Sequence, residues 1–186
     1  MINIKLLWGG RALLYKALFN NVSLPSYIGK PIFVSRYRGI KAGKRFRIYP
    51  GLRAEIIDSN SFIRIGNNVS IGQNFHVVSY DKTLYIGNDV TIAGNVFITN
   101  CDHNYKESSE SVLDNSLISR DTRIGNGCFI GNNVAILAGT VLGNHCVVGA
   151  NSVVRGEYPD YCVLAGNPAK IIKKRSKNGE KWEKIV

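Results

Sequence analysis

IGNGCFIGNNVAILAGTVLGNHCVVGANSV, residues 124–153, is the stretch that decides the fold. A six-residue unit repeats along it without a break: an aliphatic residue opens each unit, and a small or β-branched residue follows four positions later. The opening residues are Ile124, Ile130, Ile136, Leu142 and Val148. A strict period of six fits neither an amphipathic helix nor an alternating strand. Stacked coils of short strands and tight turns do produce it, so the stretch predicts an all-β solenoid.

The same unit, less regular, extends toward the N-terminus and divides the chain into three parts. Imperfect units begin near Ile40, and regular ones open at Ile65 and Ile86. The pattern stops over residues 104–123, a polar span that predicts a protruding loop. We therefore expect an N-terminal helix and irregular cap over residues 1–39, a repeat region over 40–169, and a basic tail over 170–186 in which a short strand leads into a helix.

Residues 2–20 predict a basic, mostly apolar helix, whose many leucines need a partner surface that shields them from water. Two interpretations are open. The helix packs across the open first coil, since the end of a solenoid needs a cap. Alternatively, residues 1–22 rest on an anionic lipid surface, at the inner face of a membrane, with Lys5, Arg11 and Lys16 as the charged contacts.

The charge of the chain is segregated. The net charge is +11, and residues 1–54 carry eleven Lys or Arg and no Asp or Glu. Basic ends suggest contact with phosphate or an anionic surface. No basic recognition helix or aromatic ribonucleoprotein motif indicates nucleic-acid binding. The sequence has no membrane span and no signal-peptide layout, so we expect a cytoplasmic protein.

The four cysteines predict neither a disulfide framework nor a zinc site, because none of them form closely spaced pairs. Cys128 and Cys146 are separated by three repeat units. If three units make one coil, the two thiols occupy equivalent positions in neighbouring coils and point into the core.

The repeat, together with LAGNPAKIIKK (residues 164–174) and NVFITNCDHNY (residues 95–105), resembles the hexapeptide-repeat acyltransferases. Among these it is most similar to the galactoside and maltose O-acetyltransferases and the bacterial polysaccharide O-acetyltransferases. The resemblance implies a left-handed parallel β-helix. It also implies a homotrimer with acetyl-CoA bound in clefts between adjacent subunits.

In this family a histidine at the start of the protruding loop is the catalytic base, and His103 stands at that place. The residues support the same role, because His103 alone among three histidines lies where the repeat breaks into the polar loop. An imidazole has a pKa suited to accepting a proton at neutral pH. A backbone carbonyl or a carboxylate must orient it; Asp102, Glu107, Glu110 and Asp114 are the candidates.

Four further residues are expected to contact the acceptor: His76, Asn100, Asp102 and Tyr105. His76 is equally well interpreted as a plain surface residue. The resemblance implies that acetyl-CoA lies along the solenoid wall, on small residues and then on basic residues that meet its phosphates. These positions are Asn132, Ala138, Gly139, Ala150, Lys170 and Lys173, with Arg155 as an added candidate.

These inferences predict an acetyl-CoA-dependent O-acetyltransferase that acts directly on a hydroxyl of a sugar or of a polysaccharide, such as a lipid-linked glycan, without a metal. Two alternatives are an N-acetyltransferase acting on an amino sugar and a non-catalytic hexapeptide scaffold. A zinc hydratase would share the solenoid, but the histidine spacings of 27 and 42 do not provide its ligand pair.

Overall fold

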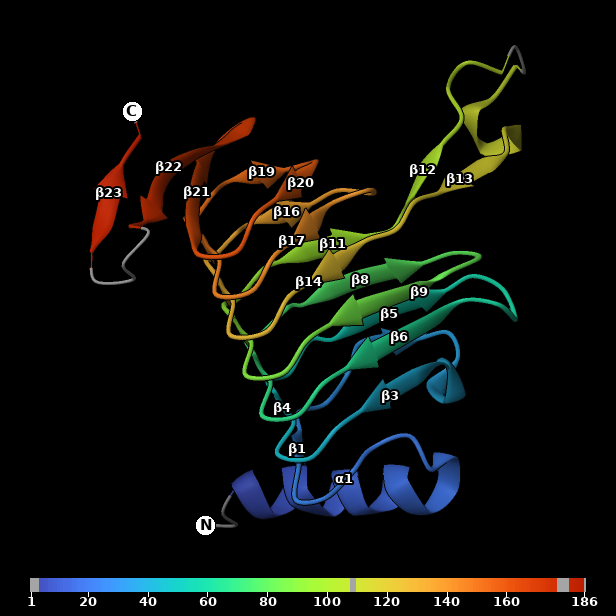
Figure 1. Ribbon diagram of the computed structural model, residues 1–186. Coiled ribbons are helices and arrows are strands. Elements are labelled where there is room, and N and C mark those ends of the chain that lie inside the picture. The colour runs from blue at the N-terminus through green and yellow to red at the C-terminus, as the bar shows by residue number, and fades with distance from the viewer. Residues whose placement is uncertain (1–3, 108–109, 177–180, 186) are drawn as a thin grey trace.

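Three β-sheets, parallel except at the C-terminal strands β22 and β23, form the walls of a solenoid in the computed structural model, which describes residues 4–107, 110–176 and 181–185 (Figure 1). Sheet 1 contains β1 (Tyr27–Ile28), β4 (Arg47–Ile48), β7 (Ser70–Ile71), β10 (Thr91–Ile92), β15 (Phe129–Ile130), β18 (Val147–Val148), β21 (Cys162–Gly166), β22 (Ala169–Arg175) and β23 (Trp182–Lys184). Sheet 2 contains β2 (Phe33–Val34), β5 (Arg53–Ile56), β8 (His76–Ser79), β11 (Phe97–Thr99), β16 (Ala135–Ile136) and β19 (Val153–Val154). Sheet 3 contains β3 (Ile40–Ala42), β6 (Phe62–Ile65), β9 (Thr83–Ile86), β14 (Arg123–Ile124), β17 (Val141–Leu142) and β20 (Glu157–Tyr158).

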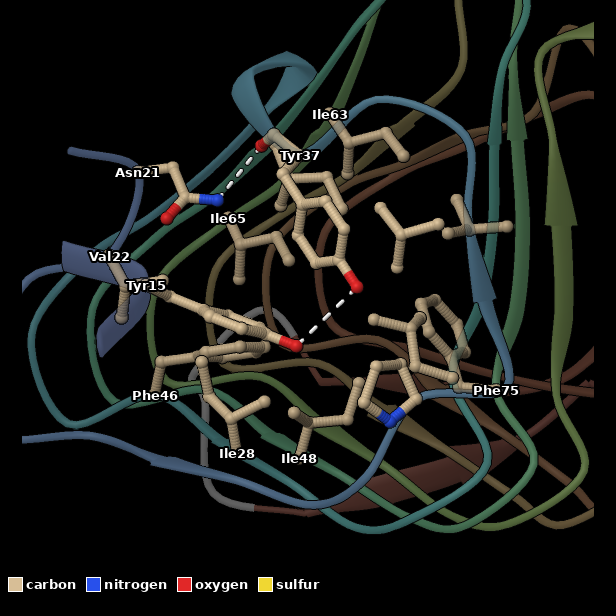
Figure 2. Close-up of a pocket in the computed structure, with 15 residues that line it drawn as sticks. Tyr15, Asn21, Val22, Ile28, Tyr37, Phe46, Ile48, Ile63, Ile65 and Phe75 are labelled. Atoms are coloured by element: carbon tan, nitrogen blue, oxygen red, sulfur yellow. Dashed lines mark hydrogen bonds between the residues drawn. The ribbon is translucent and has the colours of Figure 1, made fainter. Parts of the chain in front are cut away.

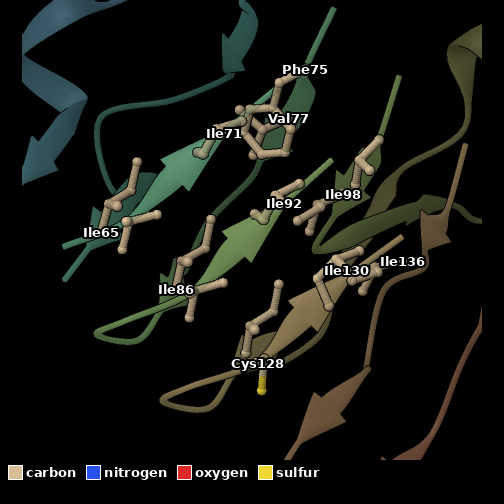
Figure 3. Close-up of a cluster of buried hydrophobic side chains, with 14 of the residues drawn as sticks. Ile65, Ile71, Phe75, Val77, Ile86, Ile92, Ile98, Cys128, Ile130 and Ile136 are labelled. Carbon is tan, nitrogen blue, oxygen red and sulfur yellow. The ribbon is translucent and has the colours of Figure 1, made fainter. Parts of the chain in front are cut away.

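The core is a set of aliphatic columns, one behind each sheet, and each column contains the residues that open the six-residue units. In sheet 1, Ile71 aligns with Ile92 and Ile92 with Ile130. Figure 3 shows these side chains stacked from coil to coil. Because each coil buries its aliphatic residues only against the coils beside it, the interior is one continuous apolar rod.

The coils are not all the same length. In the C-terminal half, partner residues such as Phe129 and Val147 are 18 positions apart, as three six-residue units require. Nearer the N-terminus, Ile71 and Ile92 are 21 positions apart, because sheets 2 and 3 there have longer strands of three or four residues. The solenoid also begins before residue 40, since β1 already pairs with β4 and β2 with β5.

Helix α1 (Ile4–Phe19) lies across the N-terminal end of the solenoid, at the place that a cap would occupy (Figure 1). Ala12, on the side of the helix that faces the coils, is fully buried, and Arg11 donates a hydrogen bond of 2.7 Å to the carbonyl of Ile28. Figure 2 shows Tyr15 pointing into the first coil, where its hydroxyl lies 3.5 Å from that of Tyr37. The 3-10 helix η1 (Tyr37–Gly39) completes this end. No helix in the described ranges has the length and hydrophobicity to cross a bilayer.

The protruding loop and the C-terminal tail differ from the prediction. The protruding segment is an ordered β-hairpin, β12 (Cys101–His103) paired with β13 (Leu117–Ser119), whose tip contains the 3-10 helix η2 (Val112–Asp114). The expected C-terminal helix is wrong for the residues that can be described. There β22 turns back antiparallel to β21, and β23 pairs antiparallel with β22, so lysine-rich residues that resemble a helix extend a sheet instead.

Candidate active site

The hairpin β12/β13 leaves the solenoid between β11 and β14 and carries His103 at the end of its first strand. His103 pairs with Leu117 across the hairpin and is exposed. Two hollows meet at this strand. One, of about 740 Å³, lies on the side of Tyr105 and Arg155, and the other, of about 420 Å³, on the side of His76. Asp102 and His103 line both, so the strand forms a ridge between two parts of one cleft.

The imidazole of His103 forms no hydrogen bond with any of the residues that the structure describes. Glu107, one candidate for orienting it, instead accepts hydrogen bonds from the backbone N–H of Ser116 at 2.7 Å and the Asn104 amide at 2.8 Å. The hydrogen bond from the Ser116 hydroxyl, and then these two bonds, hold the pKa of Glu107 below its usual value, and together they connect the two arms of the hairpin. Both ring nitrogens of His103 are therefore available to partners outside the described chain.

Asp102 faces a pair of arginines instead of His103. Its carboxylate forms an ion pair with Arg155, which follows β19, and lies 3.8 Å from Nε of Arg120, which follows β13. The arginine side chains are half exposed, at 51% each. Arg155 was expected beside the coenzyme phosphates with the C-terminal lysines; the structure places it at the His103 cleft.

His76 lies on the outer face of sheet 2, and its Nε2 is 2.9 Å from Oε1 of Glu55. The same oxygen accepts a hydrogen bond of 2.7 Å from Nε of Arg53. The bond from Arg53 first, and that from His76 to a smaller extent, lower the pKa of Glu55. The ring of Phe97 packs beside His76 at 5.0 Å. Glu55 and Phe97 thus fix the position of the His76 side chain, so His76 is not an isolated surface histidine.

Glu55 also lines this cleft, and no motif in the sequence predicts it there. Register places Arg53 opposite His76 and Glu55 diagonal to it, one coil below. The available signal was that Glu55 is the first acidic residue of the chain, at the point where the long basic N-terminal part ends.

Two of the predicted contact residues are buried and belong to the framework. Asn100 is fully buried; its amide oxygen accepts from the N–H of Tyr80 at 2.8 Å, and its amide nitrogen donates to the carbonyl of Tyr80 at 3.1 Å. It therefore holds the chain below the hairpin and offers no surface to an acceptor. Ala138 is also fully buried, whereas its neighbour Gly139 is partly exposed, with φ at +84° and the stem of Arg120 beside it. Tyr105, in contrast, is 77% exposed at the cleft.

The remaining positions expected for acetyl-CoA lie at two corners of the upper coils, on either side of sheet 2. Asn132 and Ala150 occupy one corner in successive coils, joined by a backbone hydrogen bond of 2.9 Å between Asn151 and Asn132. Lys170 lies beside this corner, since it pairs with Ala165 in the next coil. Lys173, further along β22, is exposed as well. Gly139 and Arg155 occupy the other corner, next to His103.

The cysteines are arranged as the repeat predicted. Cys128 and Cys146 are buried at equivalent positions of neighbouring coils, and Cys162 continues the column with its sulfur 3.5 Å from that of Cys146. Cys101 lies outside this column, in β12, where burial raises the pKa of its thiol. That environment favours the protonated thiol over the thiolate that nucleophilic attack requires.

Comparison with known proteins identifies the family. The family model described as bacterial transferase hexapeptide (six repeats) matches residues 121–156. An Escherichia coli K12 protein, WbbJ, named a putative lipopolysaccharide biosynthesis O-acetyl transferase, is 36% identical over 161 residues, which cover 83% of this chain and 81% of that protein. The chain belongs to the hexapeptide-repeat acyltransferase family. The resemblance in sequence is thereby confirmed, and the parallel solenoid is the left-handed β-helix of these enzymes.

Two solved acyltransferase structures share this fold. A galactoside acetyltransferase in complex with coenzyme A superimposes with a TM-score of 0.61 and 27% identity, covering 90% of this chain and 71% of that one. AntD, an N-acyltransferase from Bacillus cereus, gives a TM-score of 0.70 over 89% of both chains at 17% identity, which shows a shared fold alone.

Proposed function

We propose that this acyltransferase moves the acetyl group of acetyl-CoA to a hydroxyl of a sugar or of a polysaccharide unit on a lipid-linked glycan, with His103 as the general base. The observation that carries the proposal is the ridge formed by β12. It sets an exposed histidine without a described partner between an arginine-lined hollow and a hollow containing His76 and Glu55. The name of the Escherichia coli relative supports a bacterial surface glycan as the acceptor class.

In the proposed reaction, the imidazole of His103 removes the proton of the acceptor hydroxyl as that oxygen attacks the thioester carbonyl. The resulting tetrahedral oxyanion is stabilised by a hydrogen-bond donor at the cleft. The carbon–sulfur bond then breaks, and the imidazolium returns its proton to the thiolate leaving group. The ester product and free coenzyme A account for every atom and proton. No covalent acyl-enzyme is needed, and Cys101 takes no part.

The acceptor is assigned to the cleft on both sides of the ridge, and the donor to the wall of the upper coils. His76, fixed by Glu55 and flanked by the ring of Phe97, combines a hydrogen-bonding edge with an apolar wall, as sugar binding requires. Tyr105 and the carboxylate of Asp102 border the same cleft from the hairpin. We assign the pantetheine arm to the solenoid wall between the corner of Gly139 and the corner of Asn132 and Ala150, and the phosphates to Lys170 and Lys173, which are both exposed.

A homotrimer would complete this site. The tip of the hairpin carries Leu113, which is 83% exposed, and Val112, which is 54% exposed. A projecting hairpin with apolar residues at its tip is suited to packing on a neighbouring subunit. Such a neighbour would also supply the group that orients His103. Sedimentation analysis that returned a monomer at catalytic concentrations would remove this part of the proposal.

The test is turnover of acetyl-CoA, followed as free thiol, by the wild type and by His103→Asn with sugar, amino-sugar and glycan acceptors. Loss of the base should reduce turnover by roughly 10²–10⁴-fold. His145→Asn is the matched control, because His145 lies in a turn of the repeat and stacks on Tyr161 at 4.8 Å. Equal activity of wild type and His103→Asn would reject His103 as the base. Mild alkali cleaves an ester product but not an amide, which separates O-acetylation from N-acetylation.

A further inference from the structure

The outer face of α1 is an uncovered apolar surface. Residues 8, 12, 15 and 19 of the helix turn toward the first coil, as the burial of Ala12 and the contacts of Tyr15 show. The opposite side consists of leucines and small residues. Its exposed fractions are 71% for Leu6, 55% for Leu7, 57% for Leu13, 52% for Leu14 and 56% for Leu18. We call these five residues the leucine face.

This arrangement is the reverse of an ordinary cap. The end of a solenoid is normally closed by an element whose outer face is polar, which keeps the protein soluble. At 3.6 residues per turn, the arc of α1 that faces away from the coils contains no charged side chain. Lys5 and Lys16 lie along one edge of this arc, and Arg11 turns inward to Ile28. A continuous row of half-exposed leucines marks an interaction surface.

Charge identifies what covers the leucine face. All eleven basic residues within residues 1–54 lie on α1 and on the coils next to it, without one Asp or Glu among them. A second copy docking end to end would bring two such basic ends together and would be repelled. An anionic bilayer attracts them, and basic residues beside an amphipathic helix are typical of membrane-surface binding.

Aromatic side chains at the rim of α1 point to the same partner. Trp8, Tyr27 and Tyr49 line a shallow hollow together with Lys5 and Arg47. Trp8 packs edge-to-face on Tyr49 at 5.3 Å, and both tyrosines remain more than a third exposed. Rings with a polar end prefer the boundary between lipid tails and water, and the two cations suit phosphate headgroups there.

We propose that the leucine face of α1 inserts into the surface of an anionic bilayer, so that the solenoid stands on the membrane with its axis upright. Sheet 2 then places β11, from which the hairpin departs, three strand steps above β2. Each step between neighbouring strands raises the chain by about 4.8 Å. If the proposed function is right, the His103 cleft reaches sugars that extend from a membrane-bound carrier and misses the lipid headgroups themselves.

The test is flotation of the full chain with vesicles of phosphatidylglycerol and phosphatidylcholine, against phosphatidylcholine alone, in the absence of any acyl donor. We expect binding to the anionic vesicles that weakens with salt. Leu6→Gln/Leu13→Gln should reduce it by roughly tenfold for each leucine. The matched control is Trp182→Gln/Ile185→Gln, which removes two exposed apolar side chains from the end of the solenoid opposite α1 and should bind like the wild type.

A second measurement uses Trp8 as a reporter on the helix itself. With Trp182→Phe, Trp8 is the remaining tryptophan of the chain, and its emission should shift to shorter wavelength when anionic vesicles are added. Should the double leucine variant not fold, Leu6→Gln alone provides the comparison, since that side chain is the most exposed of the five.

Two results would overturn the proposal. One is equal flotation of the wild type and the leucine variants. The other is a smaller particle size for Leu6→Gln/Leu13→Gln in solution without vesicle binding by the wild type, which would make the leucine face an interface between copies. Because flotation needs no acetyl-CoA, its failure leaves the proposed acetyl transfer untouched, and an inactive enzyme that still floats leaves the membrane contact untouched.

Discussion

The carboxylate of Asp102 pairs with Arg155, 53 positions further along the chain, and not with the imidazole of its neighbour His103. Successive residues of a strand point to opposite faces, so adjacency in sequence keeps these two side chains apart. An acid beside a catalytic histidine is easily mistaken for its partner. Here it anchors the base of the hairpin to the upper coils.

Replacement of Asp102 should therefore act on binding more than on the base. With Asp102→Asn we expect a severalfold change in KM as Arg155 loses its partner, and an unchanged acid limb in the pH profile of kcat. Asp121→Asn, which breaks only a surface pair with Lys82 at 3.4 Å, is the control. A displaced acid limb in Asp102→Asn would show that the carboxylate acts on the imidazole after all.

The Glu55 cluster predicts a pH dependence of stability. The folded-state pKa of Glu55 lies below its ordinary value of 4.5, mainly because of the hydrogen bond from Arg53. A carboxyl with a lowered pKa stabilises the fold above its unfolded pKa, and this contribution is lost as the pH falls through the folded value. Glu55→Gln should thus lower the thermal midpoint at neutral pH, with a difference that shrinks below about pH 4.5. Glu157→Gln, at an exposed carboxylate with no ion pair in the described structure, should show no such trend.

Substitution of Asn100 tests whether this residue supports the fold or contacts the acceptor. Asn100→Ala should destabilise the fold by about 1–3 kcal/mol, because it leaves the buried backbone groups of Tyr80 without partners. Chemical denaturation measures this loss, and Asn60→Ala in an exposed turn is the comparison. A stable Asn100→Ala enzyme with a raised KM for the acceptor would restore the binding role predicted from sequence.

Two glycines should respond in opposite directions to the same substitution. A Cβ at Gly131 would lie 2.6 Å from the backbone nitrogen of Ala150, so Gly131→Ala should force adjacent coils apart and lower the thermal midpoint. A Cβ at Gly10 meets nothing within 4 Å. Gly10→Ala should therefore stabilise α1 by about 1 kcal/mol through helix propensity. An unchanged thermal midpoint in Gly131→Ala would mean that adjacent coils move apart more easily than the close contact implies.

The interior could be predicted from sequence because the repeat is translational. Once Ile124 and Ile130 are placed on the inner wall, every later unit follows, and the buried Cys128 and Cys146 follow with it. The N-terminal helix could be predicted as well, but not that one of its faces caps the coil while the other remains apolar and exposed. The sequence offered a cap and a membrane contact as alternatives; in the structure one face of α1 packs on the first coil and the leucine face stays exposed.

The cleft could be predicted only in part, because it depends on contacts between coils of unequal length. Glu55 contacts His76 on the next coil, and the coil between them is longer than three six-residue units. A fixed six-residue period therefore places Glu55 at the wrong position. The pairing of β12 with β13 has no periodic signal, since the segment between them is mostly polar. The sequence after Pro168 predicts a short strand leading into a helix; the structure has the strand, β22, but its open edge pairs with β23 at Trp182–Lys184, where the helix was expected.

The reversed strand β22 has a consequence for the molecule as a whole. Nothing in a stack of equivalent parallel coils limits the number of coils. The last coil presents the same hydrogen-bonding edge as every coil before it, as in a growing fibril. At one end α1 covers that edge, and on sheet 1 at the other end β22 runs against the direction of growth. In this sense α1 and β22 each prevent the stack from growing into a fibre. Removing β22 and the residues after it should expose the edge of β21, and size-exclusion chromatography should then detect larger, self-associated species.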